Sequence, residues 1–122
     1  VVMGGAATWA NETAGTTNVA YDLLVGPSHN IQSTAGQSKA ITGTPGYGFM
    51  THNFPSNPPK SVRMRNVSSG VNGAWTHDVT AGDSFYLDAD TRFPVGATVR
   101  MQVRSSYWTT YDTTVRGEWR SN

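Results

Sequence analysis

The sequence predicts a single all-β domain, and three observations carry this prediction. Thr, Ser, Asn and Gly, all poor helix formers, number 16, 11, 8 and 13 of the 122 residues. Several segments alternate apolar and polar side chains with the period of two that is typical of a half-buried strand. These segments recur at intervals of roughly 10 to 12 residues, as in sandwiches and barrels. We therefore expect residues 1–122 to form one antiparallel β-sandwich of jelly-roll or immunoglobulin-like type.

The first half of the chain is expected to contain short strands separated by long loops. Three prolines between residues 53 and 60 remove backbone donors, so this segment is expected to be a surface loop with polyproline character. The glycine-rich run Gly43–Gly48 is also expected to be a loop, and residues 26–37 a polar connection. The expected strands cover residues 1–9, 18–25, 38–42 and 49–52.

The second half alternates more regularly. Residues 98–105 give the clearest pattern, with Val99, Met101 and Val103 on one face and arginines and a glutamine on the other. A Thr-rich, aromatic tail over residues 107–119 is expected to close the fold. The other expected strands are 61–67, 75–79 and 84–89.

A pattern of residues occurs twice. The run Gly46-Tyr47-Gly48-Phe49-Met50, a Phe-Pro pair and Ser61-Val62-Arg63-Met64 is echoed by Gly82-Asp83-Ser84-Phe85-Tyr86, a second Phe-Pro pair and Thr98-Val99-Arg100-Met101. Two readings stay open at this point. Either strand–loop–strand units on one scaffold have converged on similar patterns, or a hairpin has been duplicated to give pseudo-symmetry.

Composition and motifs favour no catalytic, metal or cofactor chemistry. The chain has no Cys, and its three His lack a metal-binding spacing. Asp88 and Asp90 are expected on one strand face as surface or turn residues, with weak calcium binding as an alternative. A net charge of +1 is too small to predict nucleic-acid binding, and no apolar run is long enough to span a membrane. We therefore expect a protein that is not an enzyme and has no cofactor.

Four arginines are expected to share one sheet face. If the strands 61–67 and 98–105 belong to the same sheet, then Arg63, Arg65, Arg100 and Arg104 form one cationic patch together with Gln102. Arginine favours planar, bidentate partners such as carboxylates, phosphates or sulfates. The alternative is a solvated sheet face that discourages edge pairing.

Aromatic residues exceed what a thin core needs, with four Trp and five Tyr in the chain. Alternation places Tyr107 and Tyr111 on one face of their segment and Trp108 and Asp112 on the other, so we expect one of these sets to be exposed. An exposed ring beside polar groups can stack on a sugar or anchor a protein partner. The predicted ligand-binding residues are Trp75, His77, Arg100, Arg104, Tyr107, Trp108, Tyr111 and Asp112.

These features favour a secreted, non-enzymatic, lectin-like protein that binds a glycan or glycoconjugate. Secretion is inferred from the Thr-, Ser- and Asn-rich, Lys-poor composition and from the start at Val1 without Met, although an edited sequence would also start this way. One alternative is an inhibitor or effector that binds a protein through the Pro-rich loop 54–60. Another is a structural or coat subunit, and self-association into a homo-oligomer stays open.

Overall fold

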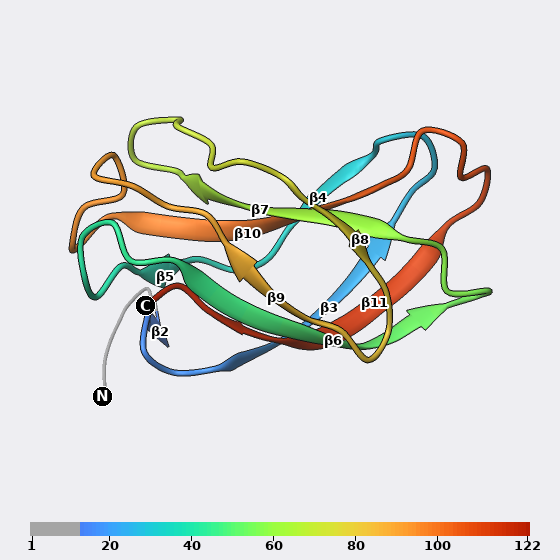
Figure 1. Ribbon diagram of the computed structural model, residues 1–122, viewed down its shortest axis with the longest axis horizontal. Helices are drawn as coiled ribbons and strands as arrows, with labels where there is room; N and C mark the ends of the chain where they lie inside the picture. The colour runs from blue at the N-terminus through green and yellow to red at the C-terminus, as the bar shows by residue number, and fades with distance from the viewer. Residues whose placement is uncertain (1–12) are drawn as a thin grey trace.

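A computed structural model describes residues 13–122 as a sandwich of two β-sheets (Figure 1). The all-β prediction is confirmed, because this part of the chain contains strands, turns and loops and no helix. Accordingly, it has no helix long and apolar enough to cross a membrane. The strand expected over residues 1–9 lies outside the described residues.

The two sheets differ in size. Sheet 1 has the order β2-β5-β10-β7-β8, and β4 pairs with β10 beside β5. Sheet 2 has the order β3-β11-β6-β9. All pairs are antiparallel except β2 with β5. The strands of sheet 1 are β2 (Thr13–Ala14), β4 (Ile31–Ser33), β5 (Gln37–Ser38), β7 (Lys60–Asn66), β8 (Thr76–Val79) and β10 (Thr98–Ser105); those of sheet 2 are β3 (Val19–Val25), β6 (Gly46–Phe54), β9 (Ser84–Leu87) and β11 (Thr113–Arg120).

From β3 onward, the chain passes from one sheet to the other at almost every connection. β4 and β5 act as one interrupted strand, because both pair with β10 on the same side. With them counted together, only the step from β7 to β8 stays within a sheet. The first strand of sheet 2, β3, pairs with the last, β11. This connectivity is that of a jelly roll, which identifies the first of the two expected sandwich types.

The core lies between the two sheets and follows the alternation of the strands. Along β10, Val99, Met101 and Val103 are fully buried, and the residues between them face away from the core. Trp119 of β11 is the largest buried side chain, and Phe93 reaches the core from the loop between β9 and β10. The inward and outward faces predicted for residues 98–105 are therefore confirmed.

Several predicted boundaries were wrong. The expected loop at Gly43–Gly48 contains the first residues of β6. Here a side chain at Gly46 would meet Met64 and one at Gly48 would meet the ring of Phe85, so the glycines permit close packing in a strand.

Other differences follow from pairing partners distant in sequence. β4 forms within the expected polar connection because it pairs with β10, and the expected strand 38–42 is reduced to β5. The loop expected over residues 53–60 is shorter, since β6 runs to Phe54 and β7 begins at Lys60. In the tail, only residues from Thr113 onward form a strand.

The repeated pattern corresponds to two equivalent units. The first copy runs from β6 in sheet 2 to β7 in sheet 1, and the second runs from β9 in sheet 2 to β10 in sheet 1. The copies pair with each other in both sheets, β6 with β9 and β7 with β10. In sheet 1, Met64 lies opposite its counterpart Met101. The two units are therefore related by a pseudo-two-fold arrangement.

Candidate functional site

The predicted cationic patch exists on the outer face of sheet 1. β7 and β10 are neighbours, with Arg65 opposite Arg100 and Arg63 opposite Gln102. Arg104 lies two residues beyond Gln102 along β10, on the same side of the sheet. We call Arg63, Arg65, Arg100 and Arg104 the arginine face.

Trp75 supports two members of this face. The Cζ atoms of Arg63 and Arg104 lie 4.1 and 4.2 Å from the centroid of the indole ring, within the range of a cation–π contact. Arg63 is fixed further because its Nε donates to Oε1 of Gln102 at 2.8 Å. The ring of Trp75 therefore serves first to position two guanidinium groups.

A cleft of about 350 Å³ lies at the end of sheet 1 next to Arg104. This volume falls within the range of small-molecule sites, roughly 300–1,000 Å³. Four predicted site residues, His77, Arg104, Tyr107 and Trp108, line it. We call it the end cleft; its other lining residues are His29, Lys60, Ser61, Asp78 and Ser106.

Two loops form one wall of the end cleft. The loop after β3 and the loop after β10 lie side by side at the right-hand end of Figure 1. Ser28 joins them twice, since its backbone N–H donates to the Thr109 carbonyl at 3.1 Å and its Oγ to the Tyr107 carbonyl at 3.1 Å. The His29 ring meets the Tyr107 ring edge to face, with centroids 6.0 Å apart. These contacts hold the loop after β10, which carries Tyr107 and Trp108, against the loop after β3 at the end of the sandwich.

A β-bulge forms the opposite wall. Lys60 pairs with Val79 and Val62 with Thr76, so two residues of β8 lie opposite one residue of β7. The bulged residue Asp78 has a φ of 62°, in the left-handed region that few non-glycine residues adopt. His29, across the cleft, also has a φ of 62°. Such conformations concentrate at binding sites, where the surrounding structure maintains them.

Ser61 and His77 form the polar centre of the end cleft. The Ser61 Oγ lies 2.8 Å from His77 Nδ1, a hydrogen bond across the two strands. A catalytic Ser–His pair is usually oriented by a third group. No hydrogen bond joins the His77 ring to a carboxylate within residues 13–122. Both side chains can exchange hydrogen bonds with a ligand in the cleft.

The rim of the cleft is aromatic and accessible. Tyr107 is 72% exposed and Trp108 is 56% exposed, although both belong to residue types that tend to be buried. We expected one set of tail residues to be exposed, either Tyr107 with Tyr111 or Trp108 with Asp112. Both sets are exposed, because residues 107–112 form a loop and not a strand.

The remaining predicted residues lie outside the end cleft. Tyr111 and Asp112 are exposed in the same loop as Trp108, but neither lines the cleft. Arg100 lies on the arginine face four residues from Arg104, about 13 Å along the strand. Four of the eight predicted residues therefore line the end cleft. Trp75 is connected to the cleft by its contact with Arg104, and the other three lie apart from it.

Of the acidic pair considered for calcium, Asp88 and Asp90, the second is already bound by an arginine. Asp90 accepts three hydrogen bonds from the Arg92 guanidinium, at 2.7, 3.0 and 3.2 Å, and this contact lowers its pKa to about 2. Asp88 lies just beyond the end of β9 and not within the strand. Residues 13–122 contain no group of three or more potential metal ligands.

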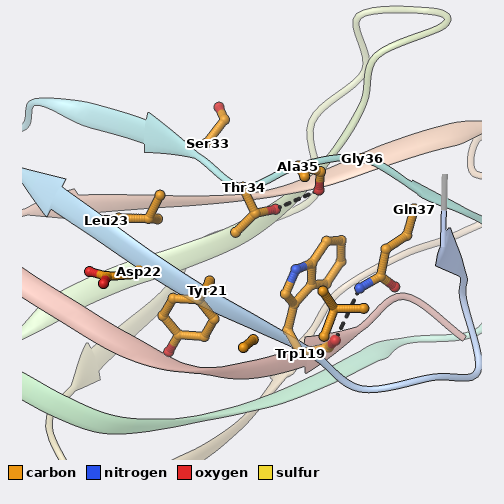
Figure 2. A pocket seen from close by; sticks show the side chains of 11 residues that line it. Tyr21, Asp22, Leu23, Ser33, Thr34, Ala35, Gly36, Gln37 and Trp119 are labelled. Atoms are coloured by element: carbon orange, nitrogen blue, oxygen red, sulfur yellow. Dashed lines mark hydrogen bonds between the residues drawn. The ribbon is translucent and has the colours of Figure 1, made fainter. Parts of the chain in front are cut away.

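Two other depressions have less suitable walls. A cleft of about 200 Å³ opens between β3 and the segment from Ser33 to Gln37 (Figure 2). Its largest ring, Trp119, is 1% exposed, and the Gln37 amide already donates to the Trp119 carbonyl at 3.0 Å. On the outer face of sheet 2, a depression of about 380 Å³ contains the ion pair of Asp22 and Arg116. Neither depression has an exposed aromatic side chain in its lining, unlike the end cleft.

The residues of the end cleft that sequence reasoning missed come from distant parts of the chain. His29 and Asp78 lie next to predicted residues only because loops and a bulge converge there. The sequence offered one signal for Asp78, its position next to the predicted residue His77. Strict alternation hid this signal, because it places neighbouring residues of a strand on opposite faces. Comparisons of the chain with protein families, curated proteins and solved structures found no match.

Proposed function

We propose that this protein is a secreted, non-enzymatic carbohydrate-binding protein and that the end cleft holds the glycan. The observation that carries the proposal is the pairing of an exposed aromatic rim, Tyr107 and Trp108, with polar side chains that line the same cleft. An aromatic face packs against the C–H face of a sugar, and hydroxyl and imidazole groups exchange hydrogen bonds with its hydroxyls.

The polar lining of the cleft offers complementary partners for hydroxyl groups. Asp78 supplies a carboxylate acceptor and Arg104 a guanidinium donor, while Ser61 and His77 can each donate or accept. The loops that carry the aromatic rings are bonded to each other through Ser28, so little order needs to be gained on binding. Jelly rolls include lectin domains as well as capsid proteins, so the proposal rests on the site and not on the fold.

The proposal is tested first on a glycan array and then by titration of the strongest ligand. We expect Trp108→Ala to weaken binding at least tenfold, because it removes the stacking ring from the rim. Tyr86→Ala is the matched control, since Tyr86 is 66% exposed on sheet 2, away from the end cleft. An array with no signal, or an equal loss in both variants, would contradict glycan binding in this cleft.

A second candidate function rests on the Pro-rich loop at the same end of the molecule. Phe54 is 62% exposed at its start, and the loop is braced by hydrogen bonds from the Asn53 side chain to the Pro58 carbonyl and from Ala81 N–H to the Asn57 side chain. A rigid loop with an exposed ring suits insertion into a partner protein. Stoichiometric inhibition of a secreted protease, together with a blank glycan array, would favour this candidate.

A further inference from the structure

The arginine face carries positive charge that no carboxylate within residues 13–122 neutralises. Two ion pairs occur among residues 13–122, Asp90 with Arg92 and Asp22 with Arg116, and neither lies on this face. Within sheet 1, Arg65 and Arg100 lie directly opposite each other, an arrangement of like charges that destabilises a sheet. Burial, followed by the charges of Arg104 and Arg65, lowers the pKa of Arg63. An anion bound here would relieve this repulsion.

The four arginines form two pairs. Arg63 and Arg104 each contact the ring of Trp75, and Arg104 lines the end cleft. Arg65 and Arg100 face each other nearer the other end of the strands. Arg100 and Arg104 lie about 13 Å apart along β10, and Arg63 lies between them in register, opposite Gln102, so the four guanidinium groups extend over more than a single small anion spans.

Three of these side chains are held in place, Arg65 by hydrogen bonds from its Nη1 to the Asn72 side chain at 2.8 Å and to the Gly70 carbonyl at 3.2 Å, and the pair beside the end cleft by the Trp75 ring. Arg100 is exposed and makes no hydrogen bond through its side chain within residues 13–122. The three fixed guanidinium groups suit bidentate binding of sulfate or carboxylate groups, and Arg100 can turn toward the same ligand.

We propose that the outer face of sheet 1 binds an extended acidic polysaccharide, whose sulfate or carboxylate groups lie on the two arginine pairs and whose end occupies the end cleft. This inference rests on the proposed glycan-binding function and adds the class of ligand. Gln102 lies between Arg100 and Arg104 along β10, and its amide, which bonds to Arg63 and Ser33, keeps a further N–H for a sugar hydroxyl. The exposed rings are confined to one end of the face, whereas a single-stranded nucleic acid is bound by stacking along its length.

The test uses heparin as a sulfated polysaccharide and desulfated, N-acetylated, carboxyl-reduced heparin as its uncharged counterpart, each titrated against the full chain. We expect heparin to bind at least tenfold more tightly, with an affinity that falls as salt is raised from 50 to 500 mM. The double variant Arg65→Gln/Arg100→Gln should lose at least tenfold in heparin affinity. The control Arg116→Gln/Arg120→Gln removes the same charge from β11 on sheet 2 and should lose less than threefold.

The outcomes separate this inference from the proposed function. Equal binding of the two heparins, or equal losses in the two double variants, would overturn the inference. Binding of a neutral glycan that Trp108→Ala weakens would leave the proposed function standing in that case. A blank array with no binding of either heparin would overturn both. Tighter binding of an oligothymidylate than of heparin would also overturn the inference, since it would assign the face to nucleic acid. Thermal unfolding of each variant verifies that it is folded.

Discussion

At the scale of single residues, both lysines of this chain are buried, although lysine is rarely found fully buried. The ammonium group of Lys39 donates to the backbone carbonyls of Thr44, Ser121 and Asn122, which ties the end of β11 to the loop after β5. Lys60 donates to the Pro58 carbonyl at 3.2 Å. Carbonyl groups thus replace water around charges that no carboxylate neutralises in the described part of the chain.

This burial gives the stability of the protein a distinct pH dependence. Desolvation lowers the pKa of Lys39 and of Lys60 from 10.5 to about 8. Above pH 8 the unfolded chain therefore binds more protons than the folded chain, and the free energy of unfolding should rise with pH. We expect a rise on the order of 1 kcal/mol per pH unit for each lysine up to about pH 9.5.

The rise can be measured by urea unfolding between pH 7 and about pH 9.5. The upper limit matters because burial raises the pKa of Tyr21, which lowers stability at higher pH. The variant Lys39→Met/Lys60→Met is the control, since its unfolding free energy should not rise over this interval. A wild-type value that stays constant or falls would contradict the expectation.

At the scale of elements, irregularities in the strands place side chains that alternation alone would misplace. The bulge in β8 brings both His77 and Asp78 to the end cleft. A second irregularity lies in sheet 2, where the register between β11 and β6 shifts between Arg116 and Gly117. There the hydroxyl of Tyr21 crosses over Gly117 and donates to the Phe49 carbonyl at 3.0 Å.

Gly117 is the residue on which this second irregularity depends. A Cβ atom at this position would collide with the Phe49 carbonyl and the Tyr21 hydroxyl. We expect Gly117→Ala to lower the free energy of unfolding by about 3 kcal/mol, because the colliding groups belong to a paired strand and a buried ring.

Gly26→Ala is the matched control for this change. The three atoms nearest to a Cβ atom there belong to the exposed Asn30 side chain, at 3.0–3.2 Å, so a shift of a few tenths of an ångström accommodates it. Chemical denaturation of both variants measures the difference. Equal stability losses would show that packing at Gly117 is looser than the structure indicates.

At the scale of the whole molecule, the pseudo-two-fold arrangement places the same residue type in two different environments. Phe93, in the loop between β9 and β10, is fully buried, whereas its counterpart Phe54, before the β6–β7 loop, is 62% exposed. We expect Phe93→Ala to lower the free energy of unfolding by about 3–5 kcal/mol. Phe54→Ala should lower it by less than about 1 kcal/mol.

Thermal or urea unfolding of the two variants tests the prediction within one scaffold. The result would be contradicted by similar losses at both positions. A large loss at Phe54 would also remove this ring as a contact for a partner, since its role would then be structural.

The sequence predicted the sandwich and the arginine face because these features follow from alternation within single strands. The spacing alone predicts a buried face for Val99, Met101 and Val103, and all three are fully buried. β4 could not be predicted, because residues 31–33 form a strand only through pairing with Gln102 to Arg104. The same holds for the end cleft, where the contact between Ser28 and Tyr107 joins residues 79 positions apart.

The ends of the described chain meet at the side of the sandwich opposite to the end cleft (Figure 1). The Asn122 N–H donates to the Gly15 carbonyl at 2.8 Å, so the start and the end of the described residues lie next to each other. A tether or a resin joined at Asn122 would therefore leave the cleft oriented away from the support in the binding experiments, and the ligand would approach from the open side.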